Sequence, residues 1–174
     1  MKTRTILSAL VLLVCTVTAL SQTRGPAATV KAFYRFSNSR SPVFNRRHIE
    51  SRKQWYSPEL YRTFLNELRE QEVFLKQHPT DKPFFGDGLD FRPLDEPCVK
   101  DGKHYRRSQR ISSVDIVRTR AYVDVEFGYP KACTIETPIL YRVQLKKLAG
   151  KWLIDDWTYS DGTTLTRDMK ENGP

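Results

Sequence analysis

The sequence RAYVDVEFG at residues 120–128, followed by ILYRVQLK at residues 139–146, determines how this chain folds. In both stretches apolar side chains alternate with polar ones. A period of two is typical of half-buried antiparallel strands, with one face in the core and the other in water. We therefore predict two strands whose inward-facing residues are the apolar set. That set is Ala121, Val123, Val125 and Phe127 on the first strand, and Ile139, Tyr141, Val143 and Leu145 on the second.

Two further strands are predicted on either side of this pair. Residues 107–117 precede it and residues 151–159 follow it. The dipeptide Ala149-Gly150 suits a tight turn between the last two strands. The sequence therefore predicts an antiparallel meander of about four strands.

Helices are expected ahead of the sheet. Residues 26–37 place apolar side chains three and four positions apart, and Pro26 suits a first helical turn. Residues 45–56 are expected to form a short helix. The clearest start signal is Ser57-Pro58-Glu59, where serine caps free amides, proline fits the first turn and glutamate complements the positive helix end. His78-Pro79 is expected to end this helix.

An apolar stripe follows the Ser57 start signal, with Glu67 assigned to the opposite, water-facing side. Residues 163–171 are expected to form a short terminal helix. Helices followed by strands favour an α+β fold, with N-terminal helices packed on one face of a curved, cone-like antiparallel sheet.

The segment between helices and sheet, residues 79–104, is rich in Pro and Gly and is predicted to be irregular. Cys98 lies at its end, and Cys133 lies in a second turn-rich stretch. Two cysteines in an oxidising compartment suggest one disulfide, with two separate free thiols as the alternative.

The first 21 residues are typical of an export signal. Lys2 and Arg4 precede an apolar run, and Ala19-Leu20-Ser21 suits a signal peptidase. We expect cleavage before Gln22, a single domain over residues 22–174, and a periplasmic or secreted protein. The alternatives are a membrane anchor, for which the apolar run is short, and lipid attachment at Cys15.

The chain carries 29 basic and 20 acidic residues. The predicted signal holds two of the basic residues and no acidic one, which leaves 27 against 20 and a net charge of +7. Such a charge attracts anionic partners, or simply favours solubility. For an exported protein, an anionic envelope component is one candidate partner beside an unidentified protein or small ligand, and nucleic acid is not expected. We do not expect a membrane-spanning protein.

Four segments resemble a known group of proteins, namely residues 30–34 (VKAFY), 55–60 (WYSPEL), 120–127 (RAYVDVEF) and 150–157 (GKWLIDDW). They are similar to exported bacterial domains of unknown function with the nuclear-transport-factor-two-like fold, a cystatin-like cone. The resemblance implies a curved sheet that wraps the helices and leaves a pocket. Relatives of this fold include isomerases, dehydratases, binding proteins and scaffolds, so the fold does not fix the function.

Carboxylates are the only candidates for catalysis, and none is assigned a definite role. Asp87 and Asp90 lie in the Gly-rich loop, while Asp155 and Asp156 are neighbours on the last strand and should point to opposite faces. A carboxyl buried in an apolar pocket would have a raised pKa and could act as a general acid or base. Loop capping and ion pairing are the alternatives. The three histidines are scattered, so we predict no metal and no cofactor.

Aromatic residues with polar tips are candidates for a ligand pocket, although such residues more often belong to the core. The candidates are Tyr34, Trp55, Tyr56, Tyr141 and Trp157. The leading hypothesis is an exported, non-enzymatic binding module with a protein or small molecule at the concave face of the sheet. One alternative is a small isomerase or dehydratase with a buried carboxylate. Another is an immunity-type inhibitor protein.

Overall fold

The computed structural model describes residues 25–40, 43–82, 91, 93, 98–131, 133 and 138–172. The predicted export signal with Cys15, and the candidates Asp87 and Asp90, lie outside the described residues.

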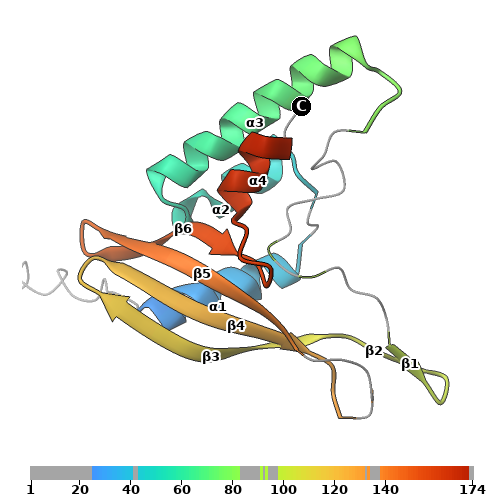
Figure 1. Cartoon of the computed structure of the whole chain (residues 1–174), viewed down its shortest axis with the longest axis vertical. Helices are drawn as coiled ribbons and strands as arrows, with labels where there is room; N and C mark the ends of the chain where they lie inside the picture. Colours follow the sequence, from blue (N-terminus) through green and yellow to red (C-terminus); the bar gives the residue numbers. More distant parts are fainter. Residues whose placement is uncertain are drawn as a thin grey trace, which may run out of the picture.

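Helices and strands follow the predicted order (Figure 1). The helices that precede the sheet are α1 (Pro26–Asn38), α2 (Arg46–Arg52), a single 3₁₀ turn η1 (Lys53–Trp55) and α3 (Pro58–Gln77). The strands are β1 (Cys98–Lys100), β2 (Lys103–Tyr105), β3 (Ser108–Val117), β4 (Arg120–Gly128), β5 (Ile139–Leu148) and β6 (Lys151–Thr158). The last element is α4 (Leu165–Asn172). The predicted α+β fold is confirmed.

Four strands form one antiparallel sheet in the order β3-β4-β5-β6, with β3 and β6 at its edges. Val123 lies directly opposite Val143, and both are fully buried. All four apolar residues of β4 are buried, as are Tyr141, Val143 and Leu145 of β5. We call this the inner face of the sheet and the opposite side the outer face. The predicted alternation is therefore confirmed.

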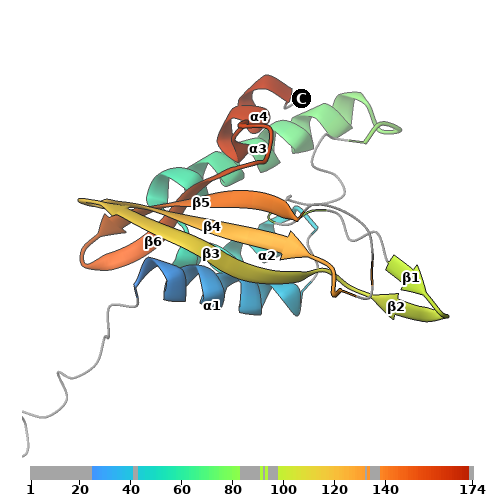
Figure 2. The same ribbon diagram turned by 60° about the horizontal axis from the view of Figure 1, so that its bottom comes forward.

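Helix α1 covers the inner face, where it contacts β3, β4 and β6 (Figure 2). Helix α3 begins at the β6 edge, where Tyr56 forms a parallel bridge with Ile154 and Ser57 N–H donates to the Ile154 carbonyl at 2.7 Å. From there α3 runs away from the sheet (Figure 1). The Ser57 cap is present, since Ser57 Oγ accepts from Leu60 N–H at 3.1 Å.

A β-bulge changes the phase of β6. Gln144 is opposite Asp156, whereas Leu145 is opposite Ile154, so Asp155 is an extra residue without a partner in this register. A bulge of this kind resets the alternation of side chains along a strand. Ile154 and Trp157 are consequently both fully buried, and the two aspartates between them are both only half-buried. The bulge interrupts the strict alternation, so adjacency alone does not decide which face Asp155 takes.

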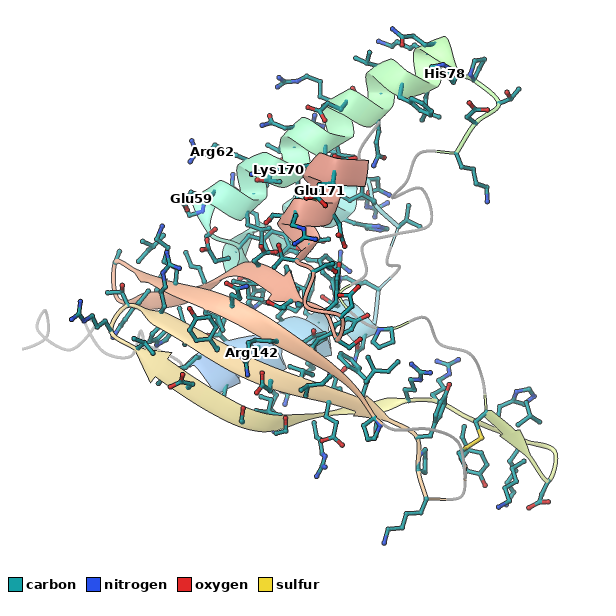
Figure 3. The ribbon with its side chains drawn as sticks, in the orientation of Figure 1. Glu59, Arg62, His78, Arg142, Lys170 and Glu171 are labelled. Carbon is teal, nitrogen blue, oxygen red and sulfur yellow. A yellow bond between two sulfur atoms is a disulfide. The ribbon has the colours of Figure 1, made fainter. Side chains whose placement is uncertain are left out.

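The end of the segment predicted to be irregular contains a small hairpin, β1 paired with β2. Its turn is Asp101-Gly102, and both residues have positive φ, at 51° and 69°. Asp-Gly is the preferred pair for a two-residue turn of this type. Cys98 at the start of β1 is joined to Cys133 in the predicted disulfide (Figure 3).

We predict that removing this disulfide lowers stability without changing the fold. The bond closes a loop of 35 residues, and in the chain-entropy model a loop of that size stabilises by about 3–4 kcal/mol. Replacing both Cys98 and Cys133 with Ser should lower the free energy of unfolding in urea by about that amount. Two titratable thiols in the denatured, unreduced wild-type protein would contradict the disulfide itself.

Candidate functional site

A cleft opens between α1 and the β3 side of the sheet. Its volume is about 580 Å³. We call it the α1–β3 cleft. It lies on the inner face, because Val125 of β4 and Ile111 of β3 contribute to its lining and are opposite each other in the register.

The floor of the cleft is apolar. Val30 and Tyr34 lie one helical turn apart on α1, so both project to the same side of the helix. Val30 is fully buried, and Val125 faces it from the sheet. Ile111 is partly buried and packs against the same core. Because Val30, Tyr34 and Val125 are almost completely buried, Ile111 supplies most of the apolar surface that a ligand can reach.

The rim of the cleft is polar and basic. Lys31, Arg35 and Asn38 line it from α1, at spacings of four and three that keep them on one side of the helix. Gln109 and Arg110 line it from β3. Asn38 Nδ2 donates to Gln109 Oε1 at 3.1 Å, which bridges the helix and the strand.

The cations of the rim differ in their partners. Arg110 forms an ion pair with Glu126 at 2.8 Å across the strand pair. Lys31 and Arg35 are exposed, and neither has a carboxylate partner among the residues that the structure describes. The cleft therefore carries positive charge that no acidic group on the described lining offsets.

Tyr34 is the only one of the predicted aromatic candidates that lines the cleft. Its hydroxyl is held in the core, where it donates to the Phe91 carbonyl at 2.8 Å and accepts from Trp157 Nε1 at 3.2 Å. Burial raises the pKa of Tyr34 above its usual range, so the phenol stays protonated. Tyr34 is thus a rigid wall rather than a proton donor to a ligand.

The other four aromatic candidates belong to the packing. Trp157 is fully buried, and Tyr56 is nearly so. Tyr141 packs between Phe127 and Tyr159, at ring distances of 5.4 and 5.1 Å. Trp55 is half-buried and packs on Phe36 at 4.6 Å.

The Tyr56 hydroxyl is buried and has no hydrogen-bond partner in the described part of the chain. Burial also raises the pKa of Tyr56. The two buried tyrosines, Tyr34 and Tyr56, therefore differ in whether their hydroxyls contribute to the fold.

The carboxylates described in the last strand lie away from the cleft. Asp156 accepts from Thr166 N–H at 3.1 Å and from the Thr166 hydroxyl at 2.5 Å, so it holds the first turn of α4 to β6. It also accepts from Trp157 N–H at 2.8 Å. Asp155 is the bulge residue described above.

Two acidic residues have roles that the sequence interpretation missed. Glu67 was assigned to the water-facing side of its helix but is buried, and that burial raises the pKa of its carboxyl. Its position, three after Phe64 and seven after Leu60, places it on the apolar stripe, which is the signal that was overlooked. Gln71 Nε2 donates to Glu67 Oε1 at 3.0 Å.

Asp124 is the centre of a polar cluster on the outer face of the sheet. Arg142 Nε donates to Asp124 Oδ1 at 2.7 Å, and the Ser113 hydroxyl donates to Asp124 Oδ2 at 2.5 Å. The hydrogen bond from Arg142 holds the pKa of Asp124 below its usual range. Asp124 and Arg142 face each other in the β4–β5 register, so the pairing of the two strands is enough to predict this contact.

No three His, Cys, Asp or Glu side chains in the described segments are grouped so as to hold a metal ion. Within those same segments, none of the helices is both long and apolar enough to cross a membrane. In comparisons with known proteins, no family model, no curated protein and no solved structure matches this chain.

We predict opposite results for two Tyr→Phe variants. Tyr34→Phe removes a hydroxyl and leaves the Phe91 carbonyl and the Trp157 indole N–H unsatisfied in the core, which should cost about 1–3 kcal/mol of unfolding free energy. Tyr56→Phe removes a buried hydroxyl that has no described partner, so it should be neutral or stabilising. Urea unfolding of the two variants tests this, and equal losses would contradict the assigned roles.

A pH-dependent contribution to stability is predicted for Asp124. Its pKa in the folded protein lies below the unfolded value of about 3.9, so the stabilisation is present above that value and is lost as pH falls through the folded pKa. Asp124→Asn should lower the unfolding free energy by about 1–2 kcal/mol at pH 7, and the difference from wild type should shrink below about pH 4. Glu126→Gln is the matched control, since its partner Arg110 is largely exposed and such pairs contribute about 0–1 kcal/mol.

Proposed function

We propose that this chain is an exported, non-enzymatic binding module that holds a small molecule in the α1–β3 cleft. The observation that carries the proposal is the cleft itself, an apolar floor with a polar rim on the inner face of the sheet. Its volume of about 580 Å³ falls within the usual range for small-molecule sites, about 300–1,000 Å³.

The surroundings of the cleft support this role. Its helix side is fixed to the sheet through the core, because Val30, Phe33 and Tyr34 of α1 are all buried there. A preformed site of this kind loses little conformational entropy when a ligand binds. Export is part of the proposal because the N-terminal segment is typical of a signal, and the resemblance to exported cone-fold domains agrees with it.

An isomerase-like reaction is less well supported by the same geometry. That chemistry needs a carboxylate or another general base within reach of the bound molecule. The described lining of the cleft contains no acidic or imidazole side chain, and its tyrosine hydroxyl is bonded within the core. The buried carboxyl of Glu67 lies on α3, which contributes nothing to the described lining.

Filling the cleft should weaken the binding of a neutral apolar probe. N-phenyl-1-naphthylamine fluoresces when it enters an apolar site, and the wild-type protein should bind it with a stoichiometry of one. Ile111→Trp places an indole over the floor and should weaken binding by about tenfold or more, because the apolar surface is then covered.

Val117→Trp is the matched control. Val117 lies on the same strand and is exposed, but it does not line the cleft, so this variant should bind the probe like wild type. Circular dichroism would establish that both variants keep the fold. If the wild type does not bind the probe, or if both Trp variants bind it equally well, the cleft is not the site.

A further inference from the structure

We infer that the ligand of the α1–β3 cleft is an anionic amphiphile, with an aliphatic body and a single carboxylate or phosphate head. This inference rests on the proposed function of the cleft and adds the chemical class of its ligand. Three features carry it: two cations without described acidic partners, an apolar floor, and an apolar strip that continues along β3.

The cations define where the head group binds. Lys31 and Arg35 lie four residues apart on α1, which places them one above the other on the helix surface. Both line the cleft, and both lack a carboxylate partner among the described residues. An anion between them would be bound by two charged donors at the edge of an apolar surface, where charge-assisted hydrogen bonds are stronger than neutral ones.

The third basic residue of the lining provides a contrast. Arg110 is already paired with Glu126, so its charge is satisfied within the protein. Elsewhere on the sheet Asp124 is paired with Arg142 in the same way. The unsatisfied charge on the described lining is therefore confined to the helix side of the cleft.

The body of the ligand is defined by an apolar strip along β3. Val114 is opposite Val123 and Ile116 is opposite Ala121 in the register, so both side chains lie on the inner face, as Ile111 does. Yet Val114 and Ile116 are 43% and 53% exposed, whereas their partners on β4 are fully buried. Val114 and Ile116 are two positions apart on the same face, so together they offer an exposed apolar surface to an aliphatic ligand.

The strip begins next to the cleft, because Val114 is the next inward-facing residue of β3 after Ile111. Strand β3 runs alongside α1, and its last residues lie near the beginning of the helix (Figures 1 and 2). The opposite end of the cleft is closed by the Asn38–Gln109 hydrogen bond. A head group at Lys31 and Arg35 would thus leave an aliphatic chain free to extend over Ile111 and on towards Val114.

The test is competition against N-phenyl-1-naphthylamine with three compounds that share a twelve-carbon chain: sodium dodecanoate, dodecyl phosphate and dodecanol, each below its critical micelle concentration. At least one of the two anions should displace the probe from wild type about tenfold more effectively than dodecanol, because only the anions can use the two cations. Whichever anion binds more tightly identifies the head group.

Charge reversal separates the head-group site from general basicity. The double variant Lys31→Glu/Arg35→Glu should abolish the roughly tenfold preference of the protein for the anions over dodecanol. The matched control is Lys100→Glu/Lys103→Glu, with the same change in charge on the exposed β1–β2 hairpin. That control should change anion binding by less than about twofold, because the effect of distant surface charges is screened.

Two outcomes would overturn the inference and leave the proposed function standing. In the first, the neutral probe binds in the cleft but neither anion competes better than dodecanol. In the second, the anions compete but charge reversal at Lys31 and Arg35 has no greater effect than the control. A wild-type protein that does not bind the neutral probe would instead contradict the proposed function itself.

Discussion

The structure depends on the packing of α1 and β6 around a shared aromatic cluster on the inner face of the sheet. Phe33 packs against Trp157 at a ring distance of 5.5 Å, and Tyr34 joins the same indole through a hydrogen bond of 3.2 Å. The two elements are 123 residues apart in sequence at that bond. Because Tyr34 also lines the cleft, the interaction that fixes the helix to the sheet also fixes one wall of the candidate site.

Most of the fold could be predicted from local patterns, because those patterns report burial directly. The alternation in β4 and β5 follows from one face lying in the core, and the Ser57-Pro58-Glu59 signal follows from unsatisfied amides at a helix start. Both patterns involve only residues that are close together in the sequence, so they can be recognised without knowing the tertiary structure. The water-facing assignment of Glu67 was wrong, because that residue is buried on the apolar stripe of its helix. The bulge at Asp155 could not be predicted from alternation, since it is set by the packing of Ile154 and Trp157 on either side of it.

The candidate site could not be predicted in the same way. The cleft joins Lys31 and Arg35 on α1 to Gln109 and Arg110 on β3, more than seventy residues later. Nothing in either segment alone indicates that a space exists between them. The sequence interpretation chose conspicuous aromatic residues instead, and four of those five fill the core because large rings bury the most apolar surface. Among the five candidates, Tyr34 alone both packs in the core and lines the cleft.

The distribution of charge distinguishes the two faces of the sheet. On the outer face, Asp124 is paired with Arg142, and the Ser113 hydroxyl donates to the second oxygen of the Asp124 carboxylate. The charges of this pair are therefore satisfied within the protein. On the inner face, β3 leaves Val114 and Ile116 exposed, and the neighbouring helix α1 carries two cations that have no acidic partner in the described chain. A molecule with both an anionic head and a hydrocarbon chain would pair with the cations and also cover the exposed apolar surface. A purely polar or a purely apolar ligand would do only one of these.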